Sequence, residues 1–216
     1  GDDARAITTG SDGSIYITGI AGGELDGQTY SGGYSDAFIS KLNPDGTKEW
    51  TRFLGTTSQD YGDVGDAITT GLDGSIYIAG HTYGNLDGQT NSGSLDAFIS
   101  KFNSDGTKEW TRLVGSSSLD DAKGITIASD GSIYIAGTTF GDFDGQTNSG
   151  GDDAFISKFS ADGEKQWTKL FGSTKGDDAR AITTGLDGSI YITGITLGQL
   201  DGQTYSGGYS DAFISK

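Results

Sequence analysis

The sequence Asp12-Gly13-Ser14-Ile15-Tyr16-Ile17 decides the fold, because it recurs along the chain. Its copies begin at Asp12, Asp73, Asp130 and Asp187. A second string, Asp-Ala-Phe-Ile-Ser-Lys, begins at Asp36, Asp96, Asp153 and Asp211. Self-similarity at a fixed period, here roughly 58 residues, is the signature of a repeat protein. The spacing predicts a single array of units at about 1–55, 56–115, 116–172 and 173–216, the second being longer around 59–65.

Each unit is expected to form four short strands. In the first unit they cover 4–9, 14–18, 36–42 and 48–54. Asp-Gly pairs between apolar runs, as at Asp12-Gly13 and Asp45-Gly46, predict two-residue hairpin turns of type I′. Helices are not expected, because no stretch keeps a 3.6-residue period and glycine interrupts the chain repeatedly. Each unit therefore predicts one antiparallel sheet.

A lone sheet of this kind would expose apolar side chains on both faces, so neighbouring units must stack. The sequence predicts an all-β, β-propeller-like array of four-stranded antiparallel blades. Residues 1–41 and 176–216 differ at only four positions: Ser11/Leu186, Ala21/Thr196, Gly22/Leu197 and Glu24/Gln199. Such a three-unit duplication points to an array that continues, so an open superhelical stack of the same sheets in a filament is the alternative.

The fourth unit lacks the tryptophan-containing strand that the others carry at Trp50, Trp110 and Trp167. Its open edge is expected to be filled by another chain or left unpaired, which makes self-association through this edge a candidate interaction. The sequence has no methionine and no charged-then-apolar leader. We therefore expect the chain to be a processed piece of a longer protein.

Composition excludes several classes of partner. The net charge is −16, so nucleic acid would be repelled, whereas cations such as Ca²⁺ would be attracted. Without cysteine, neither disulfides nor thiolate metal sites can form. No segment approaches the ~18 apolar residues of a membrane-spanning helix. Thirty-eight glycines against one proline favour a turn-rich β protein.

One continuous pattern resembles a known family. Residues 1–19, the run from Asp36 to Gly46, and Trp50 with Phe53-Leu54-Gly55 are similar to the SBBP-type β-propeller repeat of bacterial secreted and cell-surface proteins. The resemblance covers all four units and implies that the strand of Ile7 lies innermost and that of Trp50 outermost. It implies an extracellular or cell-surface location and no shared catalytic motif.

The long loop of each unit carries Asp-Gly-Gln-Thr, almost unchanged between copies. We predict a Ca²⁺ cage from its Asp and Gln with the Asp that opens the third strand, because these supply the oxygen ligands that calcium prefers. The alternative is that these side chains only hold the loop's own backbone. The candidate ligands are Asp26, Gln28, Asp36, Asp87, Gln89, Asp96, Asp144, Gln146, Asp153, Asp201, Gln203 and Asp211.

Enzyme activity is not expected. The single histidine, His81, is placed in a loop and has no partner with which to form a zinc site or a nucleophile pair. A lyase or hydrolase with a site in the central channel is the alternative. Acidic residues before the first strands either line a channel mouth or shield a strand edge: Asp2, Asp3, Asp63, Asp66, Asp120, Asp121, Asp177 and Asp178.

The sequence thus predicts a non-enzymatic extracellular module for adhesion or assembly. Its expected partners are protein or glycan at the long loops. Exposed aromatic side chains supply contact area at low entropic cost, and the candidates on these loops are Tyr30, Tyr34, Tyr205 and Tyr209.

Overall fold

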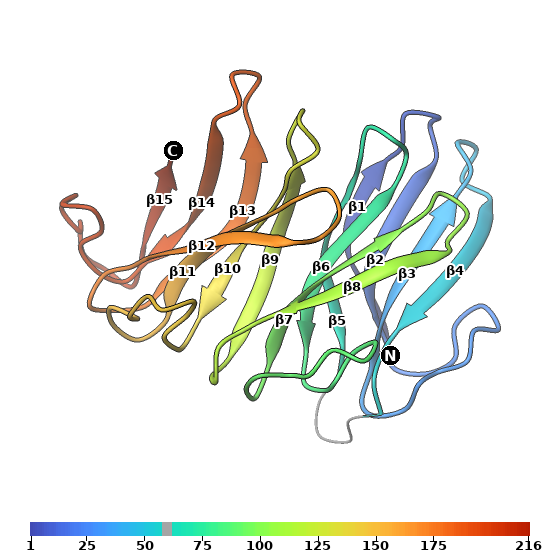
Figure 1. Ribbon diagram of the computed structural model, residues 1–216, viewed down its shortest axis with the longest axis horizontal. Coiled ribbons are helices and arrows are strands. Elements are labelled where there is room, and N and C mark those ends of the chain that lie inside the picture. The colour runs from blue at the N-terminus through green and yellow to red at the C-terminus, as the bar shows by residue number, and fades with distance from the viewer. Residues whose placement is uncertain (58–61) are drawn as a thin grey trace.

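The computed structural model describes residues 1–57 and 62–216, which form fifteen strands and no helix (Figure 1). Part of the predicted insertion at 59–65 lies outside the described residues. The strands are β1 (Asp2–Thr9), β2 (Ile15–Ala21), β3 (Asp36–Leu42), β4 (Lys48–Leu54), β5 (Val64–Thr70), β6 (Ile76–Thr82), β7 (Asp96–Phe102), β8 (Lys108–Val114), β9 (Asp120–Ile127), β10 (Ile133–Thr139), β11 (Asp153–Phe159), β12 (Lys165–Phe171), β13 (Asp177–Thr184), β14 (Ile190–Thr196) and β15 (Asp211–Ser215).

The strands form four antiparallel sheets in chain order: β1-β2-β3-β4, β5-β6-β7-β8, β9-β10-β11-β12 and the three-stranded β13-β14-β15. The second strand of each sheet lies between two neighbours, and in the two internal sheets it is covered on both faces, as its apolar run requires. This confirms the predicted all-β array of four-stranded antiparallel sheets. No helix in the described part of the chain is long and apolar enough to cross a membrane.

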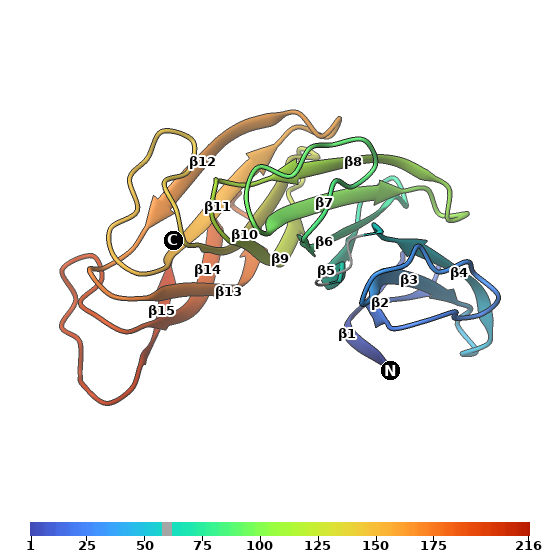
Figure 2. The same cartoon turned by 90° about the horizontal axis from the view of Figure 1, so that it is seen from below.

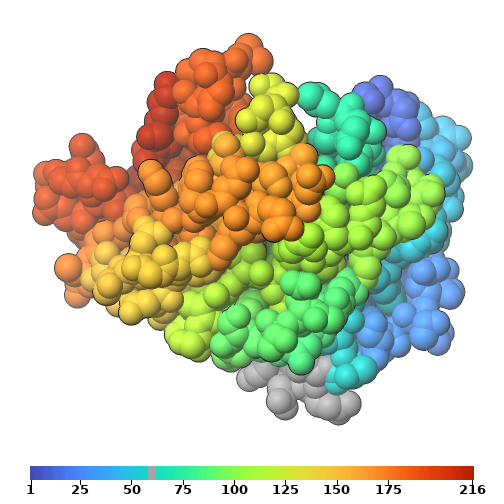
Figure 3. All heavy atoms as spheres, viewed as in Figure 1, coloured from blue at the N-terminus to red at the C-terminus, as the bar shows by residue number. Residues whose placement is uncertain are grey.

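The four sheets are arranged as an arch (Figure 2). The first strands β1, β5, β9 and β13 adjoin one another along its inner side, and the later strands lie toward the outside. The first and last sheets stand at opposite feet of the arch, so the described residues leave the ring unclosed. In the space-filling view the units form adjoining bands, with the last long loop projecting at one end (Figure 3).

The core consists of the layers between successive sheets. We call the face of a sheet that looks toward the next sheet in sequence its forward face, and the opposite one its backward face. Between the first two sheets, Tyr16 and Ile39 on the forward face pack against Ile76, Ile78 and Phe98 on the backward face. Equivalent clusters fill the other two junctions. Strand alternation sends one apolar set to each face, so every internal sheet has two buried faces.

The hairpin turns differ from the prediction. At the first hairpin the Gly13 N–H donates to the Gly10 carbonyl and the Gly10 N–H to the Ser14 carbonyl. Gly13 has a φ of 83°, whereas Asp12 is not among the residues with positive φ. This is a three-residue connection in which glycine alone takes the left-handed conformation, not a two-residue type I′ turn. The Asp12 carboxylate instead accepts the Ser14 N–H at 2.9 Å.

Candidate functional site

Each first strand contains a bulge that places one charged residue outside the regular pairing: Arg5, Asp66, Lys123 and Arg180. The second strand carries a glycine opposite each bulge. At Gly80 and Gly137 an added Cβ would stand 1.8 Å from a first-strand carbonyl oxygen, so only glycine fits. Because a bulge re-aims a side chain, the inner edge of every sheet presents one charge toward its neighbours.

These charges form what we call the axial charge chain, which crosses all four sheets. Arg5 Nη1 lies 2.5 Å from Asp66 Oδ1, and Asp66 Oδ2 lies 3.1 Å from His81 Nδ1. His81 Nδ1 also lies 2.8 Å from Asp121 Oδ1. Further along, Lys123 Nζ is 3.8 Å from Asp121 Oδ2 and 2.7 Å from Asp178 Oδ1. Arg180 Nε completes the chain 3.0 Å from Asp178 Oδ2. Positive and negative groups alternate throughout.

His81 lies within β6, so its predicted place in a loop was wrong. Burial opposes its charge, but the hydrogen bond and charge of Asp121 and of Asp66 raise the pKa of His81 to about 9. Asp66, His81 and Asp121 have ligand atoms within 4.8 Å of one another, which is close enough for a metal ion. A metal ion would bind here only by displacing the imidazolium proton, which already neutralises the two carboxylates. The cluster is an ion-pair network.

The predicted acidic motif divides into two roles along the first strands. Asp121 and Asp178 join the axial charge chain, while Asp63, Asp120 and Asp177 turn the other way and are buried between sheets. Successive residues on a strand point to opposite sides, which explains the division. Asp2 and Asp3 are exposed, because they lie on the face of the first sheet that no other described sheet covers.

The Asp-Gly-Gln-Thr loops contain the type I′ turns that were predicted for the hairpins. Asp26 and Gly27 have φ values of 56° and 71°, and the Gln28 N–H donates to the Leu25 carbonyl at 3.0 Å. The Asp26 carboxylate accepts the Thr51 hydroxyl at 2.6 Å and pairs with Lys48 of β4. Asp87 contacts Thr111 and Lys108 in the same way, and Asp144 lies 2.5 Å from Lys165 Nζ.

The glutamine of the loop also reaches the fourth strand. Gln146 Nε2 donates to the Thr168 carbonyl at 2.6 Å, and its Oε1 accepts the Leu170 N–H at 3.1 Å. Asp36 lies elsewhere, against Gly55 at the far end of β4. Thr51 and Gly55 are four residues apart, or about 13 Å along a strand. The structure therefore does not bring Asp26 and Gln28 together with Asp36, so these residues do not form the predicted cage. Calcium binding elsewhere on the chain stays a prediction.

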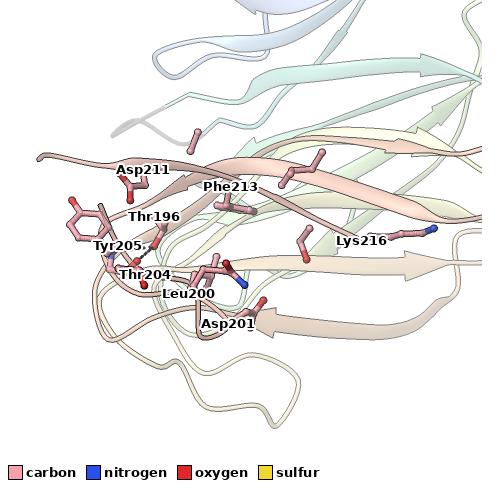
Figure 4. Close-up of a pocket in the computed structure, with 13 residues that line it drawn as sticks. Thr196, Leu200, Asp201, Thr204, Tyr205, Asp211, Phe213 and Lys216 are labelled. Atoms are coloured by element: carbon pink, nitrogen blue, oxygen red, sulfur yellow. Dashed lines mark hydrogen bonds between the residues drawn. The ribbon is translucent and has the colours of Figure 1, made fainter. Parts of the chain in front are cut away.

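The fourth sheet has an open groove where the others hold their fourth strand (Figure 4). The groove has a volume of about 490 Å³ and is lined by the loop residues Leu200, Asp201 and Gln203, by the edge of β15 and by Lys216, which follows β15. The residues that clamp a fourth strand in the third unit therefore surround an open space in the fourth.

The four loop tyrosines divide into two pairs. The Tyr30 hydroxyl donates to the Gly33 carbonyl at 2.9 Å, and that of Tyr205 to the Gly208 carbonyl at 3.0 Å, so both tie their own loop. Tyr34 and Tyr209 are exposed. Of the predicted contact residues, these two present free ring surface.

Stacked antiparallel sheets that adjoin through their first strands define a β-propeller-type repeat module. The family model of the SBBP β-propeller repeat matches residues 109–144, which confirms the resemblance. The chain is also 30% identical over 183 residues to the regulatory protein FlaEY of Caulobacter vibrioides, covering 77% of this chain and 19% of that protein. The chain thus spans about a fifth of that relative.

Among solved structures, a protein of unknown function from Bacteroides caccae aligns with a TM-score of 0.47 at 11% identity, over 89% of this chain and 53% of that chain. A glucose dehydrogenase aligns with a TM-score of 0.39 at 8% identity, over 99% of this chain and 82% of its own. The tail fiber of Staphylococcus aureus phage P68 aligns with a TM-score of 0.30 at 12% identity, over 99% of this chain and 49% of the tail-fiber chain.

Proposed function

We propose that the chain is a non-enzymatic structural and binding module of a secreted or cell-surface bacterial protein. It assembles by stacking further sheets of the same repeat on its two end faces, and the long loops offer contact to protein or glycan. The SBBP match supports the repeat module. Because such repeats occur in secreted bacterial proteins, it also supports the proposed location. The observation that carries the assembly role is the exposure of both end faces.

The end faces expose residues whose counterparts at the internal junctions are buried or partly buried. On the backward face of the first sheet Ile7 is 68% exposed, whereas its counterparts Ile68 and Ile125 are 8% and 7% exposed. On the forward face of the fourth sheet Ile214 is 77% exposed, against 0% for Ile99 and 9% for Ile156. Exposed apolar faces of this kind mark interaction surfaces.

The two end faces are complementary, because one is a forward face and the other a backward face. At the third junction Lys123 of one sheet pairs with Asp178 of the next. A further first sheet stacked on the fourth would bring its own Asp3 to Arg180 in the same relation. A contact between different faces repeats without limit unless the rotation closes a ring. The proposed product is therefore a series of head-to-tail assemblies.

The inner edge supports a non-enzymatic role. In the described residues, the charged groups that face the arch axis pair with one another along the axial charge chain. A catalytic acid or base needs to reach substrate with a pKa near the working pH, and an imidazolium held at a pKa of about 9 does not act as a base there. Ligand contact is better placed on the exposed rings of Tyr34 and Tyr209.

Sedimentation velocity over a concentration series tests the assembly. The wild-type chain is expected to form a ladder of species that grows with concentration, and Ile214→Asp to leave a monomer, because a charge on the forward face must be desolvated on stacking. Leu186→Asp is the matched control, since Leu186 is fully exposed at the tip of a hairpin. A wild-type monomer at every concentration would overturn the proposal, as would equal loss in both variants.

A further inference from the structure

Each junction between successive sheets buries two aspartates without a cationic side chain. One opens the third strand of a sheet and the other precedes or opens the first strand of the next sheet. The pairs are Asp36 with Asp63, Asp96 with Asp120 and Asp153 with Asp177, and each of these residues is 0% or 1% exposed. Within the described residues, none of the six forms an ion pair. Buried charges without compensation are costly.

The two carboxylates of a pair share one short linker. At the middle junction, a Cβ on Gly115 would stand 2.4 Å from Asp96 Oδ1. The next residue, Ser116, donates its N–H to Asp120 Oδ2 at 2.6 Å. The Asp120 N–H also donates to the Leu95 carbonyl at 2.8 Å, so the two strand starts lie side by side.

The other junctions repeat this geometry. Gly55 lies against Asp36 while the Thr56 N–H donates to Asp63, and Gly172 lies against Asp153 while the Ser173 N–H donates to Asp177. The linker glycine is therefore required at each junction, because any side chain there would strike the carboxylate.

Most of these carboxylates have an oxygen without a hydrogen bond. Asp96 Oδ2 accepts the Ser92 N–H at 2.8 Å, whereas its Oδ1 is buried and accepts none. The Oδ1 atoms of Asp36, Asp153 and Asp177 are likewise buried and accept no hydrogen bond. Burial is the largest effect on Asp96 and raises its pKa. The hydrogen bond from Ser92 lowers this pKa, and the nearby charge of Asp120 raises it further. Each junction therefore holds two buried carboxyl groups without a compensating cation, and a free buried acceptor.

We propose that each of the three junctions binds one Ca²⁺ ion between its paired aspartates. Only oxygen ligands are present, as calcium requires. Backbone carbonyls crowd the loop residue that follows Ser92: the Ser116 and Ser118 oxygens would stand 2.8 and 2.4 Å from a Cβ on Gly93. Two carboxylates balance a divalent charge, and the loose ligand geometry suits Ca²⁺ better than the stricter octahedral Mg²⁺. The proposal is independent of the end faces.

Thermal unfolding of the full chain with EDTA, CaCl₂ or MgCl₂ tests this site. Because an ion that binds only the folded state stabilises it, Ca²⁺ at about a hundred times its Kd should raise the Tm by about 5–10 °C for each occupied site, and Mg²⁺ by less. Asp96→Asn keeps the size of the side chain and its acceptor for Ser92, and should reduce the Ca²⁺-dependent shift. Asp87→Asn, in the loop of the same unit, is the matched control and should keep the full shift.

Native mass spectrometry of the wild-type chain with Ca²⁺ gives a readout that does not depend on a variant folding. Three ions per chain are expected, one for each junction. Absence of bound Ca²⁺ overturns the proposal, and so does a full Ca²⁺ shift in Asp96→Asn or its loss in Asp87→Asn. If the wild-type chain binds no Ca²⁺, shows no Ca²⁺-dependent change in Tm and is most stable at acidic pH, then shared protons neutralise the aspartate pairs instead.

Discussion

His81 holds a positive charge between carboxylates that come from two sheets. Asp66 approaches it from β5 and Asp121 from β9, and Arg5 and Lys123 stand beyond them. The corresponding positions in the other units are Ile20, Thr138 and Ile195, so the second unit alone places a titratable group at this point. The histidine substitutes for the cation that the other sheets supply from their bulges, because the second bulge carries Asp66.

The stability of the protein should fall as the pH rises past neutrality. The folded-state pKa of about 9 lies above the ordinary 6.5, so the contribution of His81 is complete below pH 6.5 and is lost as pH rises through 9. The loss should reach up to about 3 kcal/mol of unfolding free energy, measured by urea denaturation at a series of pH values. His81→Thr, which copies the third unit, should remove the slope. A wild-type curve that stays flat from pH 6.5 to 9 would contradict this origin.

At this scale the sequence contains a signal that points to the axial residues. A glycine stands two residues after Ser-Ile-Tyr-Ile in the second strand of every unit, at Gly19, Gly80, Gly137 and Gly194. A fixed glycine inside a strand indicates a bulge or a close backbone approach, and here it indicates both. The ion pairs themselves could not be predicted, because they join residues of different sheets whose rotation the pattern does not determine.

The Asp-Gly-Gln-Thr loop clamps the fourth strand of its own sheet. The tight turn brings the aspartate to the lysine and threonine of that strand, and in the third unit brings the glutamine to two of its backbone groups. The near-identity of the loops therefore has a structural reason. A bidentate amide at a strand edge acts as a short additional strand and protects that edge from other partners.

Removing the amide clamp should destabilise the third unit and leave the fourth unaffected. Gln146→Ala loses both hydrogen bonds to β12 and leaves two backbone groups to find other partners, which should lower the unfolding free energy by about 1–3 kcal/mol. Gln203→Ala changes the equivalent residue of the fourth unit, beside which no fourth strand lies. It should change the unfolding free energy by less than about 0.5 kcal/mol. Equal costs in chemical denaturation would show that the glutamine acts only within its loop.

The strands were predictable from the sequence, but the turns were interchanged. Both turn types contain Asp-Gly, and they differ in whether one or two residues adopt positive φ. That difference depends on which flanking residues pair: Gly10 pairs with Ser14 across the hairpin, whereas Leu25 pairs with Gln28 in the loop. Local composition does not determine this register.

Burial between sheets is the main source of stability in an array whose sheets have no core of their own. The same isoleucine of the first strand is covered by a preceding sheet in three units and uncovered in the first. The contribution of a neighbour can therefore be measured by one substitution at equivalent positions.

Ile125→Ala should lower the unfolding free energy by about 2–4 kcal/mol, because it leaves a cavity between the second and third sheets. Ile7→Ala should change it by less than about 0.5 kcal/mol, since the side chain is already in water. Thermal or chemical unfolding of dilute, monomeric protein measures both. A large loss at Ile7 under these conditions would mean that its face is covered in solution.

The stacking of the sheets could be predicted from the sequence, but the openness of the arch could not. Two apolar faces on Ser-Ile-Tyr-Ile require neighbours whatever the overall shape. Closure depends on the rotation between sheets, which is set by the volumes of side chains such as Phe98 and Phe155 at each junction. Small differences in this angle add up over the array, so the repeat pattern alone leaves both shapes open.

The near-identity of residues 1–41 and 176–216 makes the molecule its own reference. One copy is the first sheet, covered only by the sheet that follows it, and the other is the last, covered only by the sheet before it. Amide hydrogen exchange compared between β1 and β13, or β2 and β14, reports how each neighbour slows local opening of the same peptide. A single exchange experiment on one sample thus compares the amide protection that a sheet gains from a neighbour on its backward face with the protection that it gains from a neighbour on its forward face.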